Sequence, residues 1–203
     1  MTKAIIISVG SEIVSGHIKD QNAPFIASKL SEIGYHILSQ MIVGDISEAL
    51  QSALQVALHK AAVIVITGGL GPTRNDITRE NVADVCNVTL RLDEESHTHL
   101  KRLTNNTHTT KYVNNVKQAM IPEGGTVIPN FSGTATGFFI HSHNADIICL
   151  PGVHSEMKLM VEDWVLPHLL SKSGKRKKRC VRVLKTFGMS ESALDLKVRG
   201  LIE

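Results

Sequence analysis

A glycine-rich loop offers the clearest chemistry in the sequence. The segment Thr67-Gly-Gly-Leu-Gly-Pro-Thr-Arg-Asn-Asp-Ile-Thr follows an apolar, β-branched run and opens a region with helical spacing. Glycines let a ligand approach the backbone closely, and amides that lead into a helix N-terminus attract anions. No Gly-Lys-Ser/Thr of a Walker A loop follows, and Arg74 stands where a dinucleotide fingerprint counted from Gly69 has a glycine. The loop predicts an anion site, with a plain tight turn as the alternative.

Three carboxylates accompany this loop. Asp45 follows the second apolar run, Asp76 ends the glycine-rich loop, and Glu80 lies one helical turn further on. Taken singly, Asp45 and Asp76 are typical of helix caps, and Asp45 with Glu48 resembles a capping box. Carboxylates gathered at one rim beside a phosphate-binding loop are also what a divalent cation needs to bridge protein and phosphate oxygens.

The elements that must position these groups alternate between strand and helix. We expect strands over residues 4–9, 35–43 and 61–67, and helices over 22–33, from Asp45 or Ser47 onward, and over 78–87. This order predicts parallel βαβ units in an α/β fold with helices on both faces of the sheet. In such sheets ligands bind beyond the carboxyl ends of the strands, where the loop and the carboxylates fall.

The second half of the chain is less regular. Residues 91–120 are polar and expected to be partly helical, and Gly137–His141 and Ala145–Leu150 predict a hairpin. A helix should follow, and the residues of its buried face are Val153, Met157, Met160, Val161, Trp164 and Val165. We divide the chain into an α/β domain (1–171), a basic linker (172–180) and a partial small module (181–203) with a strand-like 181–187 and then a helix. So small a module is expected to pack on the main domain or on another subunit.

Composition excludes several classes of protein. The chain has 203 residues, 42% hydrophobic and 20% charged, with no apolar run near the roughly 18 residues that a membrane span needs. Residues 172–185 hold eight Lys or Arg and no acid, and the remainder has 14 basic against 19 acidic residues, a net charge of −5. With only 4% aromatic residues, a nucleic-acid partner is disfavoured. The basic run is expected to be a solvated linker, with a nucleic-acid or phosphate contact as the alternative. Three widely spaced cysteines and no signal peptide favour a cytoplasmic protein.

Two histidine pairs are weaker candidates for a metal site. They are His97 with His99 and His141 with His143, all in polar or turn-like segments. We expect exposed loop histidines, with metal ligation as the alternative.

Seven ordered segments carry a family resemblance that spans nearly the whole chain. They are Val9-Gly-Ser-Glu-Ile-Val-Ser-Gly-His-Ile-Lys-Asp-Gln-Asn, Val43-Gly-Asp, Thr67-Gly-Gly-Leu-Gly-Pro-Thr, Asp76-Ile-Thr-Arg-Glu, Gly133-Thr-Ala-Thr-Gly-Phe, Leu150-Pro-Gly-Val-His-Ser-Glu-Met and Lys185-Thr-Phe-Gly-Met-Ser-Glu-Ser-Ala-Leu. The sequence resembles the N-terminal domain of the CinA family, which is related to the molybdopterin-binding domains of molybdenum cofactor biosynthesis. The resemblance implies a three-layer α/β/α domain that binds a phosphorylated nucleotide-like or pterin ligand, and a homo-oligomer, most simply a dimer. Some family members carry a further C-terminal amidase domain, and this sequence ends before it.

The resemblance assigns roles residue by residue. Asp45 and Asp76 match an acidic pair associated with a divalent cation (Mg²⁺, Mn²⁺ or Co²⁺, with a monovalent cation as an option), and Glu80 follows as a third catalytic candidate. The matching ligand-binding positions are Ser11, Glu12, Gly68, Gly69, Gly71, Thr73, Asn130, Gly133, Thr134, Ala135, Gly152 and Glu156. Asn75 stands where the family commonly has an acid, and His154 replaces a proline.

Three functions share this pocket at the sequence level. The first is metal-dependent hydrolysis of an ADP-ribose-like pyrophosphate, which the family's N-terminal domain implies. The second is adenylyl transfer to molybdopterin, and the third is a binding module without catalysis, which the change to Asn75 keeps open.

Overall fold

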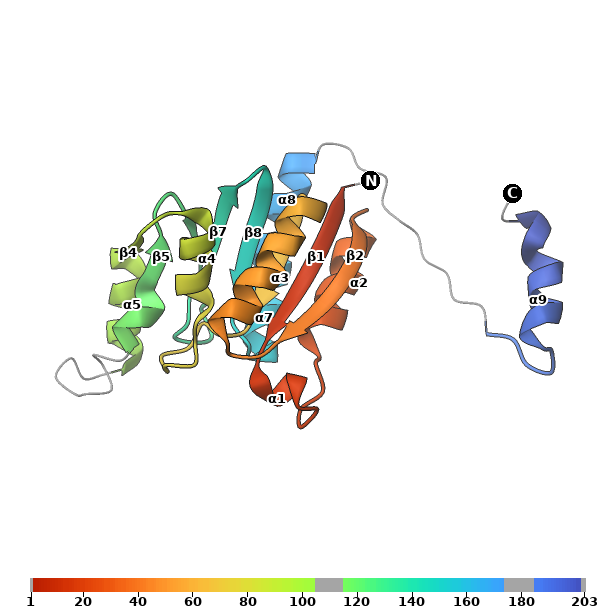
Figure 1. Cartoon of the computed structure of the whole chain (residues 1–203), viewed down its shortest axis with the longest axis horizontal. Coiled ribbons are helices and arrows are strands. Elements are labelled where there is room, and N and C mark those ends of the chain that lie inside the picture. Colours follow the sequence, from red (N-terminus) through yellow and green to blue (C-terminus); the bar gives the residue numbers. More distant parts are fainter. Residues whose placement is uncertain (1, 105–114, 174–184, 202–203) are drawn as a thin grey trace.

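The computed structural model describes residues 2–104, 115–173 and 185–201. Its centre is a six-stranded sheet in the order β2-β1-β3-β8-β7-β6, in which β7 runs in the direction opposite to the other five strands (Figure 1). The strands are β1 (Lys3–Val9), β2 (His36–Val43), β3 (Val63–Thr67), β6 (Thr126–Ile128), β7 (Gly137–Ser142) and β8 (Ala145–Leu150). The helices are α1 (Ser11–Val14), α2 (Asn22–Glu32), α3 (Ser47–Lys60), α4 (Thr78–Cys86), α5 (Glu94–Thr104), α7 (His154–Met160), α8 (Leu166–Ser173) and α9 (Glu191–Val198).

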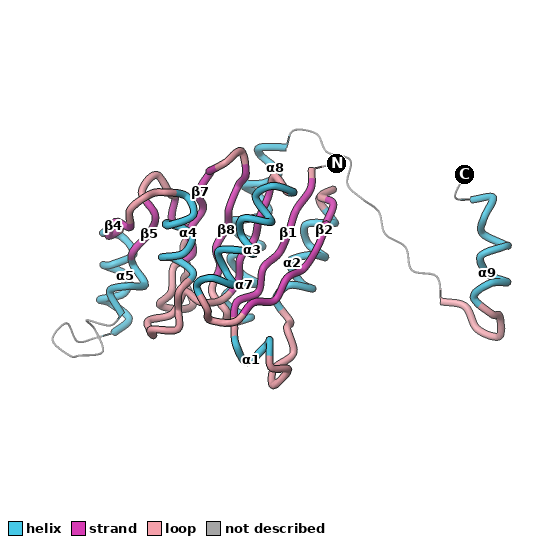
Figure 2. Tube along the Cα trace, in the orientation of Figure 1, coloured by secondary structure: helices cyan, strands magenta, loops and turns pink. Residues whose placement is uncertain are grey.

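Helices cover both faces of this sheet, as Figure 2 shows by colour. Ile5 and Ile7 of β1 point to the face packed by α3 and α4, and Ile6 between them points to the face packed by α2, α7 and α8. The alternation follows from the two-residue period of a strand, and the apolar β1 and β3 runs are those of strands buried on both sides. The predicted three-layer α/β/α fold is therefore confirmed.

Residues 90–104 and 115–122 form a small attachment at one edge of the sheet. β4 (Leu90–Leu92) pairs antiparallel with β5 (Met120–Pro122), and α5 follows β4 (Figure 1). The short 3₁₀ helix η1 (Val116–Ala119) leads directly into β5. The expectation of partial helix is confirmed, while the β4–β5 ladder was missed because three-residue strands carry too little periodicity.

The hairpin and the helix after it differ in how well they were predicted. β7 and β8 pair antiparallel through a turn in which His143 (φ 52°) and Asn144 (φ 61°) are left-handed, as a two-residue hairpin turn requires. Val153 precedes α7 and is 54% exposed, so its predicted place on the buried face is wrong. Between α7 and α8 lies the π-helical turn η2 (Val161–Val165), which contains Trp164. A π-helical turn shifts the register of the helix, so the residues after it face a different direction from those of a regular α-helix.

The C-terminal segment has little packing of its own. Residues 185–187 are not a strand, Phe187 is fully exposed, and α9 has no buried residue. The predicted contact of this module with the main domain is therefore not present in the described part, and residues 181–184 lie outside it. Cys86 and Cys149 are buried free thiols, and Cys180 also lies outside the described residues. No helix in the described ranges is both long and apolar enough to cross a bilayer.

Candidate functional site

A cavity of about 490 Å³ opens beyond the carboxyl ends of β1, β3 and β8. Its lining residues are Val9, Gly10, Glu12, Asp45, Gly68, Gly69, Leu70, Gly71, Pro72, Asn75, Asp76, Gln118, Thr134, Ala135, Pro151, Gly152, Val153 and Glu156. We call it the glycine-loop pocket. It is the position at which a doubly wound sheet binds ligands.

The glycine-rich loop forms one wall and needs glycine at its first two positions. Gly68 (φ 100°) and Gly69 (φ 66°) are left-handed, and a Cβ on Gly68 would lie 2.2 Å from the Val9 carbonyl oxygen. Thr78 at the start of α4 fixes the loop, because its hydroxyl donates to the Gly68 carbonyl (2.8 Å) and its amide to the Gly69 carbonyl (3.0 Å). The loop backbone is thus pressed against the end of β1.

Asp76 closes the same loop and does not cap α4. Its Oδ2 accepts from the amide (2.8 Å) and the hydroxyl (2.6 Å) of Thr73, and α4 begins after Ile77 without a side-chain cap. The capping expectation for Asp76 is wrong because Thr73 occupies the carboxylate. Its two oxygens also lie 2.7 and 2.8 Å from where a Cβ of Gly71 would stand, so Gly71 makes room for them.

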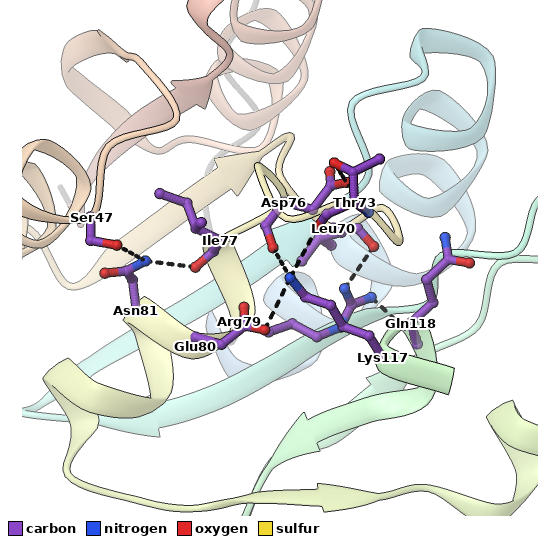
Figure 3. A network of polar contacts seen from close by, with 10 residues as sticks. All are labelled: Ser47, Leu70, Thr73, Asp76, Ile77, Arg79, Glu80, Asn81, Lys117 and Gln118. Atoms are coloured by element: carbon purple, nitrogen blue, oxygen red, sulfur yellow. Dashed lines mark hydrogen bonds and ion pairs between the residues drawn. The ribbon is translucent and has the colours of Figure 1, made fainter. Parts of the chain in front are cut away.

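Two basic side chains hold this loop from below (Figure 3). Arg79 is fully buried and donates to the carbonyls of Leu70 (2.6 Å), Gln118 (3.1 Å) and Thr136 (2.9 Å). Burial lowers the pKa of Arg79 to about 10, so the guanidinium remains charged at neutral pH. The pocket therefore has a fixed positive charge beneath it.

Lys117 of η1 ties the second half of the loop to α4. Its Nζ donates to the Thr73 carbonyl (3.2 Å) and to the Asp76 carbonyl, and pairs with Glu80 Oε1 (3.1 Å) (Figure 3). Glu80 is not among the residues that line the pocket. The structure thus does not bring Glu80 together with Asp45 and Asp76, because Lys117 holds it on the far side of the loop.

Asp45, in the loop after β2, contacts Ser11, which follows β1. Its Oδ2 accepts from the Ser11 amide (3.0 Å), and its own amide donates to the Ser11 hydroxyl (3.1 Å). The helix α3 begins after Ile46 with no side-chain cap, so the capping predictions for Asp45, Ser47 and the Glu48 box are wrong. Ser11 therefore positions Asp45, while Glu12 lines the pocket directly.

Glu156 enters the pocket from the start of α7. Its Oε2 accepts from Asn130 Nδ2 (2.7 Å), which also donates to the Ala135 carbonyl (2.9 Å). A Cβ on Gly133 would lie 2.3 Å from the Glu156 carboxylate, so the glycine leaves room for it. Of the second predicted loop, Thr134 and Ala135 line the pocket, and Asn130 and Gly133 support Glu156.

Asn22 joins the loop after β8 to the end of β3. Its Nδ2 donates to the Thr67 hydroxyl and to the Gly152 carbonyl, both at 2.9 Å, and His154 Nδ1 lies 2.8 Å from its Oδ1. The substituted His154 thus buttresses the pocket wall. Sequence reasoning missed Asn22, although it ends the first family segment, and it missed Arg79, Lys117 and Gln118.

Four carboxylates line the pocket, namely Glu12, Asp45, Asp76 and Glu156, and Asn75 lines it as well. In the described ranges no group of three or more His, Cys, Asp or Glu side chains is arranged to hold a metal ion by itself. Three of the four histidines in these pairs are not in loops: His97 and His99 lie on α5, and His141 lies on β7 with its Nδ1 2.7 Å from Asp146. The loop assignment was wrong for these three.

Comparison with known proteins agrees with this geometry. Residues 5–171 match the family described as Probable molybdopterin binding domain. A crystal structure of the protein CinA from Thermoplasma acidophilum is 33% identical, with a TM-score of 0.75 over 80% of this chain and 95% of that one. The molybdopterin biosynthesis enzyme MoaB from Thermus thermophilus shares the fold at 19% identity (TM-score 0.57, 83% and 92% of the two chains).

Curated relatives match over nearly the whole chain. A protein from Acetivibrio thermocellus that is described as a competence-damage inducible protein is 40% identical over 200 residues. A CinA-like protein from Geotalea uraniireducens is 34% identical over 201 residues. The chain spans about half the length of these relatives, 48% in both cases. Fold and site thus define a molybdopterin-binding-type α/β domain. Within that class, the chain belongs to the CinA family.

Proposed function

We propose that the glycine-loop pocket binds a phosphorylated ligand, nucleotide-like or pterin, through a divalent cation, and hydrolyses its pyrophosphate. The binding half is supported by the position of the pocket at the strand ends, by the close-packed glycine loop and by the family. The proposed cation and the proposed reaction both rest on one observation, the four carboxylates that line the pocket.

The charge of the pocket explains why a cation is needed. Among the described residues that line it, acids are present and no Lys or Arg is. A phosphate placed directly among these carboxylates would be repelled, and the buried Arg79 compensates only part of that charge. Mg²⁺ is commonly held by one or two carboxylates together with phosphate oxygens. A site completed by the ligand therefore agrees with the lack of a preformed cluster among the described residues.

The donor set fits such a cation. Asp45 and Asp76 each accept hydrogen bonds at Oδ2, and Oδ1 of each accepts none from the described residues. Each carboxylate can therefore offer one oxygen while its other oxygen keeps it in place. A bound divalent cation would supply charge neutralisation on the phosphates.

The protein groups then act on the substrate as follows. Amides of the glycine loop orient the pyrophosphate, and Glu12 or Glu156 can accept the proton of an attacking water. The water forms a new P–O bond while the bridging P–O bond breaks, so ADP-ribose yields AMP and ribose 5-phosphate.

Hydrolysis of ADP-ribose tests the proposal. AMP release is measured with no added metal and with Mg²⁺, Mn²⁺ or Co²⁺, for the wild type, for Asp76→Asn and for Asp84→Asn. Asp84 is an exposed acid of the same helix α4, so its variant is the matched control. We expect cation-dependent release that falls at least about 100-fold in Asp76→Asn and persists in Asp84→Asn.

Two results would contradict parts of this proposal. Release of AMP that is equal in Asp76→Asn would remove the assigned site. No release with any cation, together with ligand-induced thermal stabilisation, would leave the binding function and support a module without hydrolysis.

A further inference from the structure

A second cavity of about 440 Å³ lies beside the glycine-loop pocket, between α5 and the β6 strand. We call it the α5 pocket. Its lining residues are Arg91, Asp93, Glu95, Ser96, His99, Gly125, Thr126, Val127, Pro129, Asn130, Phe131 and Thr136. None of them belongs to the anion-binding loop.

The two cavities share a wall. Asn130 lines the α5 pocket, and its Nδ2 donates to Glu156 (2.7 Å) and to the Ala135 carbonyl (2.9 Å), which both line the glycine-loop pocket. Thr136 also lines the α5 pocket, and its hydroxyl donates to the carbonyl of Gln118 (2.9 Å), a residue of the glycine-loop pocket. The linings of the two cavities are therefore in direct hydrogen-bond contact, so a ligand anchored in one cavity lies next to the other.

The α5 pocket holds buried polar atoms without partners. Ser96 is 5% exposed, and neither its Oγ nor His99 Nε2 has a hydrogen-bond partner among the described residues. Both residues lie three apart on α5 and so face the same side. Buried polar groups are almost always paired in native proteins, so these two atoms leave hydrogen bonds unmade beside the cavity. Both atoms are closed to solvent, and each would meet a ligand only after its side chain turns toward the cavity.

An unusual aromatic side chain stands at the same cavity. Phe131 is 84% exposed in a chain with 4% aromatic residues, and it lines the α5 pocket. Asp93 and Glu95 add acceptors and Arg91 adds donors to the lining. An exposed aromatic face beside donors and acceptors is the combination that reads a flat heteroaromatic ring by stacking and edge hydrogen bonds.

We propose that the α5 pocket takes the heteroaromatic ring of the phosphorylated ligand whose phosphates occupy the glycine-loop pocket. This inference rests on the proposed function and assigns Ser96, His99 and Phe131 as ring-binding residues. A purine base and a pterin share the required chemistry, and the ligand arms of the test distinguish them.

Calorimetric titration in the presence of Mg²⁺ tests the inference. The probes are pyrophosphate, which has no ring, and AMP, GMP and neopterin, which carry adenine, guanine and pterin. The variants are Phe131→Ala and Ser96→Ala, and the matched controls are Phe187→Ala in the exposed C-terminal segment and Ser52→Ala on the exposed side of α3. Because Ser96 Oγ makes no hydrogen bond within the described protein, its removal should leave the melting temperature unchanged.

We expect the two pocket variants to bind at least one ring-bearing probe about tenfold more weakly and to bind pyrophosphate as the wild type does. The probe that is affected most identifies the ring. If both pocket variants bind every probe like their controls, the inference is overturned while phosphate binding stands. If the wild type binds no phosphorylated probe and no neopterin, the proposed function fails and this inference fails with it.

Discussion

Arg79 shows how a single side chain can set the shape of a site that it does not line. Its guanidinium donates to carbonyls of three segments far apart in the sequence, the glycine loop, η1 and the loop before β7. Only arginine has several donors in a rigid fork, so a lysine cannot replace it there. Arg79 thereby joins the two loops that flank the glycine-loop pocket.

Replacing Arg79 with Met should destabilise the fold. The change leaves three carbonyls with lost partners in a buried region, and we expect the free energy of unfolding to fall by at least about 3 kcal/mol. Urea denaturation followed by circular dichroism measures the loss. Arg102→Met, at an exposed position of α5, should change it by less than about 0.5 kcal/mol. A loss of under about 1 kcal/mol in Arg79→Met would show that the clamp is dispensable.

The short helix η1 acts as an element that sets the position of Asp76. Lys117→Met removes the three contacts that Nζ makes with Thr73, Asp76 and Glu80. Because the loop then moves more freely, we expect the cation concentration for half-maximal hydrolysis to rise about fivefold, while kcat at saturating cation stays near that of the wild type.

Cation titrations of the hydrolysis rate measure this effect, with Lys101→Met on the exposed side of α5 as the control. Lys117→Arg, which keeps the charge and the donors, should restore part of the cation affinity. Equal cation dependence in Lys117→Met and the control would assign η1 a purely structural role.

The junction of η2 and α8 makes a second prediction at this scale. The Trp164 and His168 rings stack with centroids 4.5 Å apart, and burial, followed by nearby Lys172, lowers the pKa of His168. A lowered native pKa means that the unfolded state binds the proton first as the pH falls below the ordinary value of 6.5. The contribution of His168 to the free energy of unfolding is therefore fully present above pH 6.5. It declines as the pH falls below 6.5 and stops declining once the pH is below the native pKa.

Melting temperatures between pH 8 and pH 5 check this sign. His168→Phe should flatten the acid-side decline that the wild type shows, and His59→Phe at an exposed position of α3 should not. An unchanged decline in His168→Phe would place its cause in other groups.

Elements were predicted better than contacts, for a physical reason. Apolar periodicity fixes strands such as β1 and β3, because both faces are buried whatever the side chains at the ends do. Asp45 and Asp76 stand at positions typical of helix caps, and the sequence therefore predicted caps. Their hydrogen-bond partners are instead Ser11 and Thr73, which the folded loops bring to them. The four-residue spacing between Asp76 and Glu80 predicts that both lie on one face of a helix. Glu80 instead pairs with Lys117, which is distant in the sequence, and this contact could not be read from the spacing.

The whole molecule assembles its site from segments that no local pattern connects. Loops after β1, β2, β3 and β8 meet because parallel strands end at one edge, which the alternation of strand and helix already predicts. The α5 pocket could not be anticipated in this way. It depends on an edge attachment whose strands are three residues long and on Phe131 in a loop, and neither has a periodic signal.

The C-terminal segment makes the last prediction, at the scale of the whole molecule. The family match ends at residue 171, α9 has no buried residue, and Phe187 and Leu196 are largely exposed. Stability follows the apolar surface that is buried, so a chain shortened to residues 1–173 should melt within about 2 °C of the full chain. Scanning calorimetry of the two chains at several protein concentrations measures this. A fall of more than about 5 °C would show that the segment packs against the domain or against a second copy, and a fall that grows with concentration would favour the second copy, because only association depends on concentration.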